Sequence, residues 1–193
     1  MRISNQKRTT KETDIALSFN LDGKKEINIQ TGIPFFDHML ELFAFHGGFD
    51  LTILAKGDVQ VDDHHTVEDV GLVLGQAFRE AIGDKQGIER YSSLYLPMDE
   101  ALVRVVIDIS NRPLLVFQAD FNRERIGGLS LENVHEFLKS FATEARITLH
   151  MSMIDGINDH HKVEALFKGL GRALKIATRK VSEDLPSTKG VLV

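Results

Sequence analysis

The sequence predicts an α+β fold built from two copies of a βββαβα unit. The hexapeptide Asp-His-His-Thr-Val-Glu at residues 63–68 returns ninety-six residues later as Asp-His-His-Lys-Val-Glu at residues 159–164. Stretches with strand-like and helix-like spacing of apolar residues also follow one another in the same order in both halves. A repeat of this length indicates that a whole structural unit was duplicated, whereas solenoid repeats are shorter.

We expect a single pseudo-twofold domain over residues 1–193, with half-repeats at about 1–87 and 88–193. Each half should form a mostly antiparallel four-stranded sheet with two helices on one face, because amphipathic helices and strands bury their apolar sides against each other.

The first half begins with alternating apolar residues at 15–21 and 27–29, which predict a hairpin with its turn at Asp22-Gly23. Proline at the first position, helical spacing of apolar residues and a closing Gly-Gly pair predict the next helix. The elements expected after the hairpin are a helix from Pro34 to Gly47, a strand over 49–57 and a helix from Asp63, its cap, to Gly83.

The second half repeats this order. The Ser-Asn-Arg-Pro stretch at 110–113 predicts a turn between two strands. We expect strands at about 91–97, 101–109, 114–120 and 145–153, and helices at about 131–144 and from Asp159, its cap, to Lys180.

Composition excludes several classes of protein. Hydrophobic residues make up 42% of the chain and charged residues 26%, as in ordinary globular domains. With 23 basic and 28 acidic residues the net charge is −5, which disfavours binding to nucleic acid. The amino terminus lacks the apolar core of a signal peptide, and no apolar run reaches the ~18 residues of a membrane span. We therefore expect a cytoplasmic protein that binds neither membrane nor nucleic acid.

The chain has no cysteine, so a metal ion must be held by imidazole and carboxylate groups. On a helix, His64 and Glu68 share one face, whereas His65 projects about 100° away. The second copy offers the same pattern through His160, Glu164 and His161. Each helix start thus presents a His/Glu pair in one direction and a single histidine in another.

His38 and His135 lie ninety-seven residues apart in corresponding helices and would add one imidazole to each of two sites. The set then comprises three imidazoles and one carboxylate per ion, which suits Mn, Fe, Zn or Ni better than Mg or Ca. One His-His pair alone is more often a solvated helix start, but two copies with glutamate at the same spacing favour metal binding. We leave His46 and His150 out of the ligand set and expect each either to serve the structure or to support a ligand.

Five motifs in this order resemble the imidazoleglycerol-phosphate dehydratase family of histidine biosynthesis, over essentially the whole chain. They are TGIPFFDHML, DDHHTVEDVGLVLG, PMDEALV, DHHKVEALFKGLGRAL and PSTKG. Pro34, Glu136 and Pro186 depart from the commonest wording of the family, but none of them replaces an expected ligand.

The resemblance implies two Mn²⁺ ions per active site, held by His38, His64, His65, Glu68, His135, His160, His161 and Glu164. It implies dehydration of D-erythro-imidazole glycerol phosphate to imidazole acetol phosphate. In this reaction the metal favours the imidazolate form of the substrate ring, which drives loss of the C3 hydroxyl.

The resemblance also assigns roles to individual residues. Glu12 becomes the candidate for proton shuttling, with Glu164 as a second catalytic carboxylate. Substrate and phosphate contacts are assigned to Glu12, Arg90, Arg112, Lys168, Ser187, Thr188 and Lys189. Asp99 and Glu100 receive no role, because a pair of acids in a loop is most often solvated.

The family further implies a homo-oligomer, a closed shell of about 24 subunits with sites between neighbours. Two other functions remain open: a noncatalytic metal-storage protein and a hydrolase that uses metal-bound hydroxide. The zinc-protease form of the second is disfavoured, because the chain contains no H-E-x-x-H motif.

Overall fold

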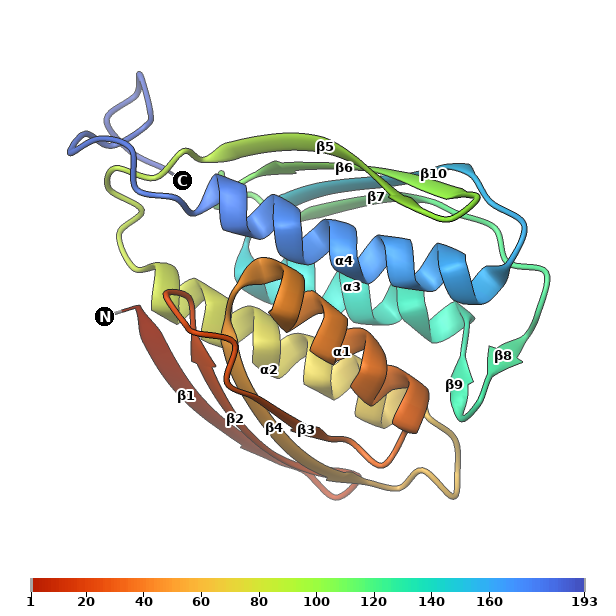
Figure 1. Ribbon diagram of the computed structural model, residues 1–193. Coiled ribbons are helices and arrows are strands. Elements are labelled where there is room, and N and C mark those ends of the chain that lie inside the picture. The colour runs from red at the N-terminus through yellow and green to blue at the C-terminus, as the bar shows by residue number, and fades with distance from the viewer. Residues whose placement is uncertain (1, 193) are drawn as a thin grey trace.

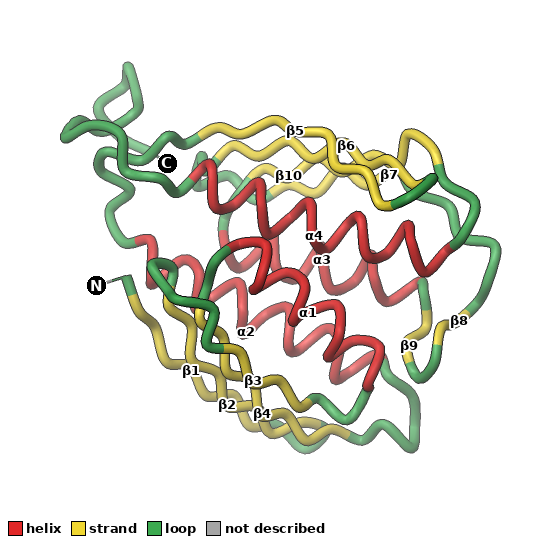
Figure 2. Tube along the Cα trace, viewed as in Figure 1, coloured by secondary structure: helices red, strands yellow, loops and turns green. Residues whose placement is uncertain are grey.

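The computed structural model describes residues 2–192. Two sheets form the outer layers and the helices lie between them, so that one face of each sheet is covered by helices (Figures 1 and 2). The helices of each half pack on the sheet of that half and also against the helices of the other half, α1 against α4 and α2 against α3. One helical layer is thus shared by the two halves.

The first half contains β1 (Ile3–Thr9), β2 (Thr13–Asn20), β3 (Ile27–Gln30), α1 (Pro34–Gly47), β4 (Asp50–Gly57) and α2 (His64–Ile82). The second half contains β5 (Tyr91–Met98), β6 (Ala101–Asp108), β7 (Leu114–Gln118), β8 (Arg125–Ile126), β9 (Leu129–Ser130), α3 (Glu132–Ala145), β10 (Thr148–Asp155) and α4 (Asp159–Ala177). Apart from the short β8–β9 pair, both halves follow the predicted βββαβα order, which confirms the α+β class.

The two large sheets have equivalent strand orders, β1-β2-β4-β3 and β5-β6-β10-β7. Three strands of each sheet are antiparallel neighbours, and the fourth runs parallel to the strand beside it. Burial alternates along β2, so that Ile15, Leu17 and Phe19 point to the helices. The mostly antiparallel sheets with helices on one face agree with the prediction.

The predicted hairpin at Asp22-Gly23 is wrong. β2 pairs with β1 and β4, and β3 pairs in parallel with β4 alone. The chain does reverse direction after β2, but β3 lies on the far side of β4, so the segment between β2 and β3 crosses over the place of β4. Asp50 at the start of β4 fixes this crossover, because its carboxylate accepts hydrogen bonds from the backbone N–H groups of Lys24 (2.6 Å) and Glu26 (2.9 Å).

β1 and the β8–β9 pair are strands that the pattern of apolar residues does not predict. Hydrophobic alternation could not reveal β1, because the residues that face α2 are polar. Ser4 and Gln6 both donate hydrogen bonds to Glu80 of α2. Arg8 donates to the nearly buried carboxylate of Asp69, also on α2, at 2.9 Å. β1 is thus attached to the helix layer by hydrogen bonds and an ion pair.

Asp63 is the N-cap residue of α2, as predicted, but it does not cap the helix through its side chain. Its carboxylate accepts hydrogen bonds from the backbone N–H and the hydroxyl of Ser130, both at 2.7 Å. The carboxylate is therefore used for a tertiary contact with the end of β9.

The predicted cap of α4 is wrong, since Asn158 and not Asp159 precedes α4 and accepts the hydrogen bond of the His160 N–H. The Asp159 carboxylate accepts from the backbone N–H groups of Asn122 and Arg123, both at 2.8 Å. Lys162 donates to the same buried carboxylate at 2.9 Å. Asp63 and Asp159, at equivalent places in the repeat, thus hold the two ends of the segment between β7 and α3.

Aromatic side chains fill the middle of the helix layer. Phe36 of α1, Phe137 of α3 and Phe167 of α4 are fully buried and meet with ring centroids 5.2–6.4 Å apart. Close helix crossings accompany this core. In α2, a Cβ at Gly75 would lie 2.6 Å from the carbonyl oxygen of Phe141, and in α4 a Cβ at Gly171 would overlap the Phe43 carbonyl oxygen.

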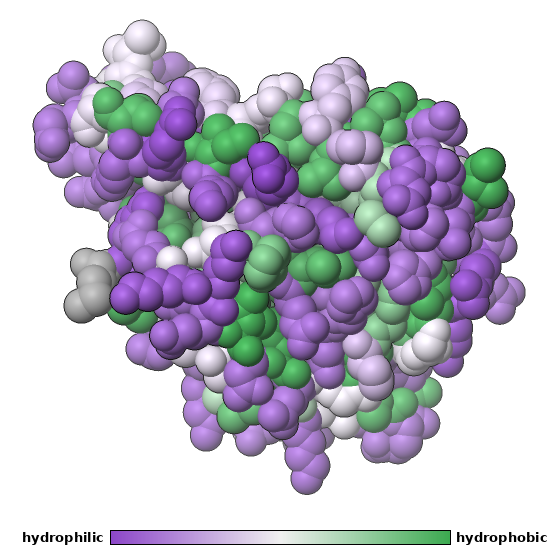
Figure 3. All heavy atoms as spheres, in the orientation of Figure 1, coloured by the Kyte–Doolittle hydropathy of each residue, from purple (hydrophilic) through white to green (hydrophobic). Residues whose placement is uncertain are grey.

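On the face shown in Figure 3, hydrophilic side chains are interspersed with small hydrophobic areas. Among residues 2–192, no helix combines the length and the hydropathy that a bilayer crossing requires.

Gly171→Ala should lower the free energy of unfolding by about 1–3 kcal/mol, because a methyl group has no room against α1. Without a clash, alanine in place of glycine would stabilise the helix by about 1 kcal/mol. A loss of stability would therefore indicate that the added methyl group clashes with α1. Urea unfolding at fixed protein concentration measures the effect. Gly128→Ala is the control, since its Cβ would meet Ile33 at an ordinary 3.5 Å. Equal or increased stability of Gly171→Ala would contradict the close approach.

Candidate metal and substrate site

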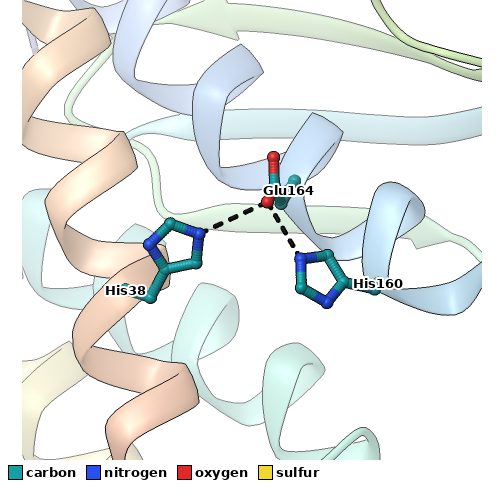
Figure 4. Close-up of side chains that lie close together, drawn as sticks. All are labelled: His38, His160 and Glu164. Carbon is teal, nitrogen blue, oxygen red and sulfur yellow. Dashed lines mark hydrogen bonds and ion pairs between the residues drawn. The ribbon is translucent and has the colours of Figure 1, made fainter.

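Two histidines and a glutamate from different halves of the chain meet between α1 and α4 (Figure 4). His38 comes from α1, and His160 and Glu164 lie one turn apart on α4. Nε2 of His38 lies 3.3 Å and Nε2 of His160 lies 3.0 Å from Oε1 of Glu164. Within residues 2–192 this is the one group of three side chains whose ligand atoms all lie within 4.8 Å of one another.

The charge of this cluster depends on Glu164. Burial opposes ionisation of its carboxyl group, but hydrogen bonds from Lys168 and His160 outweigh this effect and hold the pKa below its ordinary value. Imidazole nitrogens and a carboxylate oxygen, without sulfur, suit Mn, Fe, Zn or Ni. The donor set and its spacing therefore fit the expected type of metal ion.

The equivalent set from the other helix pair is more open. On α2, Nε2 of His64 lies 3.6 Å from Glu68, and Nδ1 of His64 lies 3.0 Å from the side-chain oxygen of Asn133 on α3. His135 on α3 directs Nδ1 toward its neighbour Glu136 at 3.0 Å. Its ring meets Phe117 edge-on. Within residues 2–192 of one chain, His135 does not join His64 and Glu68 in a metal cluster.

His65 and His161 lie apart from these pairs, as the helical spacing predicts. Nδ1 of His65 is 3.1 Å from Asp58, and Nδ1 of His161 is 2.7 Å from Glu100. These hydrogen bonds raise the pKa of both imidazoles above the ordinary value. The hydrogen bond from His161 in turn lowers the pKa of Glu100 to about 2. Asp58 and Glu100 had no predicted role.

Glu12 lies in the turn between β1 and β2, and about half of its side chain is exposed. Its carboxylate is 3.8 Å from Nε2 of His65. Two hydrogen bonds fix this turn. Thr13 donates to Asp69 of α2, and the Thr10 hydroxyl accepts from the Glu12 N–H at 3.1 Å. A free carboxylate thus stands beside one of the candidate ligands.

The candidate phosphate-binding arginines meet at Asp108. Arg90 donates to this carboxylate at 2.7 Å and to the carbonyl oxygen of Pro186 at 2.7 Å. The hydrogen bond to Asp108 raises the pKa of Arg90. Arg112 lies 3.4 Å from the same carboxylate and is largely exposed. The two arginines are therefore adjacent, and Arg90 connects them to the carboxy-terminal segment.

That segment carries the other predicted substrate contacts. The Ser187 hydroxyl donates to the carbonyl oxygen of Val191 at 2.6 Å and accepts from the Lys189 N–H at 3.3 Å. Thr188 and Lys189 are exposed. Lys168 lies apart from this group, because its amine donates to Glu164 in the histidine cluster.

The predicted residues thus form two groups at opposite ends of α4. The cluster around Glu164 lies in the first turns of the helix, whereas the Arg90 N–H donates to the carbonyl oxygen of Ala177, its last residue. A helix of 19 residues is about 28 Å long. Figure 1 shows the carboxy-terminal segment at the end of α4 remote from the start of that helix. One small molecule cannot touch both groups within a single chain.

Sequence reasoning missed three acids and an amide that contact the predicted residues: Asp58, Glu100, Asp108 and Asn133. Glu100 stands in a motif that the sequence analysis quoted, but nothing in the spacing placed it beside a histidine sixty-one residues later. Asp58 and Asp108 follow or end strands, where acids are common. No sequence pattern distinguishes these residues from solvated ones.

Comparison with known proteins gives concordant results. A family model described as imidazoleglycerol-phosphate dehydratase matches residues 31–174. The imidazoleglycerol-phosphate dehydratase of Thermoanaerobacter pseudethanolicus is 57% identical over 194 residues, which cover 100% of both chains. That of Clostridioides difficile is 53% identical over 192 residues and also covers 100% of both chains.

Two solved structures are similar in fold. The crystal structure of imidazoleglycerol-phosphate dehydratase from Staphylococcus aureus has a TM-score of 0.83 at 44% identity, covering 91% of this chain and 97% of that chain. The structure of the Pyrococcus furiosus enzyme has a TM-score of 0.84 at 42% identity, with 97% of this chain and 100% of that chain covered.

The low pKa of Glu100 predicts how stability depends on pH. As pH falls from the ordinary value of 4.5 toward about 2, the unfolded chain protonates this carboxyl group before the folded chain does. The folded state therefore loses stability over this range. Metal-free Glu100→Gln should lose less, as measured by urea midpoints at pH 5 and pH 3. Equal losses in the two proteins would contradict this assignment.

Proposed function

The chain belongs to the imidazoleglycerol-phosphate dehydratase family, and we propose that it catalyses manganese-dependent dehydration of D-erythro-imidazole glycerol phosphate to imidazole acetol phosphate. The enzyme is a hydro-lyase of L-histidine biosynthesis. The observation that supports the metal-dependent form of this reaction most directly is the cluster of His38, His160 and Glu164, which joins the two halves of the chain.

Two Mn²⁺ ions per active site would be held by the residues that the sequence analysis selected. His38, His160 and Glu164 supply three ligand atoms to one ion, and His64, Glu68 and His135 are the equivalent set for the other. His65 and His161 face away from these sets in their own chain and complete the sites of neighbouring subunits. Manganese held by these residues would supply Lewis-acid chemistry toward the imidazole ring of the substrate, which would favour loss of the C3 hydroxyl.

The protein must also move protons. Dehydration removes the proton on C2 and the hydroxyl group on C3, so the site needs one group that accepts a proton and returns it to the departing hydroxyl. Glu12 offers a half-exposed carboxylate on a turn fixed by Thr13 and Asp69. Glu164 is the second candidate, and its lowered pKa keeps it ionised near neutral pH.

The phosphate group requires cations and hydrogen-bond donors. Arg90 and Arg112 are already adjacent at Asp108, and Arg90 holds the carbonyl oxygen next to Ser187. Thr188 and Lys189 follow in the same exposed segment. Lys168 serves the ring end of the substrate from its place beside Glu164.

Because the two groups lie at opposite ends of α4, the active site requires parts of neighbouring subunits. The assembly that we propose is a closed shell of about 24 copies in the cytoplasm. Val61 and Ile157 support contacts between subunits near the starts of α2 and α4. They stand ninety-six residues apart, just before α2 and α4, and are 68% and 80% exposed. Exposed aliphatic residues beside both candidate ligand pairs fit a surface that another subunit covers.

A storage protein would use the histidines but has no use for two arginines joined to the carboxy-terminal segment. A hydrolase would release inorganic phosphate from the same substrate. The alignment of the whole chain with dehydratases favours neither alternative.

An assay on imidazole glycerol phosphate with and without a chelator tests the proposal. Activity should require Mn²⁺, vanish with the chelator and return when Mn²⁺ is added. Light scattering of the same samples should show a smaller particle after chelation, because metal bound only by the assembly stabilises it. His160→Ala should lose metal and activity, and His46→Ala serves as the control. A monomer at saturating Mn²⁺, or full activity in chelator, would contradict the proposal.

Glu12→Gln should keep the metal content of the wild type and lower kcat by about 10²–10⁴-fold, because the amide cannot take up a proton. Elemental analysis and steady-state kinetics measure the two effects. Glu26→Gln is the control, an exposed glutamate outside the site that undergoes the same chemical change. A fall of less than about tenfold would exclude Glu12 as the proton carrier.

A further inference from the structure

Both histidines that face away from the central clusters are held in the same way. Oε2 of Glu100 lies 2.7 Å from Nδ1 of His161, and Oδ2 of Asp58 lies 3.1 Å from Nδ1 of His65. A carboxylate can only accept a hydrogen bond, so Nδ1 is the donor in each pair. When the ring is neutral, its single proton is therefore on Nδ1.

The opposite ring nitrogens are left free. Nε2 of His161 is 3.8 Å from Asp99, and Nε2 of His65 is 3.8 Å from Glu12. Both distances exceed that of a hydrogen bond. Each neutral ring thus directs an unshared electron pair outward from Nε2, which is the form in which imidazole binds a metal ion.

The carboxylates come from unrelated positions of the repeat. Asp58 directly follows β4, and the residue that directly follows the equivalent strand β10 is Gly156. Glu100 instead lies in the turn between β5 and β6. Because the halves place a carboxylate on Nδ1 by different routes, the contact is not a remnant of the duplication. A shared requirement of the two histidines explains it better.

Glu100 is itself fixed in position. Its other oxygen, Oε1, accepts hydrogen bonds from the backbone N–H groups of Asn158 at 2.7 Å and Ile157 at 3.2 Å. The carboxylate therefore ties the β5–β6 turn to the residues before α4 and has little freedom to leave His161. Asp58 is fixed through its backbone, since its N–H donates to the Glu12 carbonyl oxygen at 3.1 Å.

We propose that Asp58 and Glu100 are positioning residues for metal binding, which hold His65 and His161 with Nδ1 protonated and Nε2 free to coordinate. The inference rests on the proposed metal-dependent function. Carboxylates that accept the second N–H of a metal-bound imidazole fix its orientation and make it more basic. Loss of such a partner commonly weakens metal binding by about 10–100-fold.

The test is a titration of the assembled, metal-free protein with Mn²⁺, followed through the paramagnetic resonance signal of the free ion. Glu100→Ala should raise the dissociation constant by about tenfold or more. Glu100→Gln should show a smaller increase, because the amide oxygen still accepts the Nδ1 hydrogen bond without carrying charge. Glu26→Ala is the control for an exposed glutamate outside the site.

A second mutation distinguishes orientation of His161 from a general effect on the turn. In the His161→Ala background, Glu100→Ala should weaken Mn²⁺ binding no further, since it acts through the missing ring. An equal loss in both backgrounds would overturn the proposal, because Glu100 would then act through the backbone of α4. Asp58→Ala, tested with and without His65→Ala, repeats the test in the other half and serves if Glu100→Ala does not fold.

The outcome for the wild type separates the two hypotheses. If the wild type binds no Mn²⁺, the proposed function fails and the positioning roles fail with it. If the wild type binds Mn²⁺ and the Glu100 and Asp58 variants bind it with the same affinity, only the positioning roles are excluded.

Discussion

The close crossing of α1 over α4 is the constraint on which the candidate site depends. Gly171 lets the carbonyl oxygen of Phe43 approach α4 more closely than any side chain would allow. His38 precedes Phe43 by just over one turn, and Glu164 precedes Gly171 by two turns, so the same crossing places His38 against Glu164. The stacked rings of Phe137 and Phe167 support this arrangement from the middle of the helix layer. The packing of the core therefore also sets the geometry of the cluster.

The charges follow from this packing. Glu164 is almost buried and would be costly to ionise alone, but His38, His160 and Lys168 all direct nitrogen atoms at it. These donors hold the pKa of Glu164 below its ordinary value and keep the carboxylate ionised despite its burial. At the other end of α4 the signs are reversed. There the carboxylate of Asp108 forms ion pairs with two arginines that would otherwise repel each other.

The duplication is unequal where chemistry requires it. Asp69 in α2 holds the turn that carries Glu12, whereas the equivalent position in α4 is the buried Ala165. The β5–β6 turn is instead held by Glu100 through the backbone before α4. Similar helices and sheets are thus kept in both halves, and the turns next to the histidines have diverged.

The sequence by itself determined the fold class and most of the elements, and it included His38, His160 and Glu164 among eight candidate ligands without grouping these three together. Periodicity fixed which residues form helices, and the i, i+4 spacing fixed that His160 and Glu164 share a face. It could not give the strand order, because the crossover after β2 depends on contacts of Asp50 with distant backbone. It placed Asp63 correctly at the N-cap of α2 but misassigned Asp159 as the cap of α4. Neither carboxylate caps its helix, since the donors to both lie in another segment. Only the tertiary structure decided that the arginines lie a helix length from the histidines, because distance in space is set by packing and not by spacing along the chain.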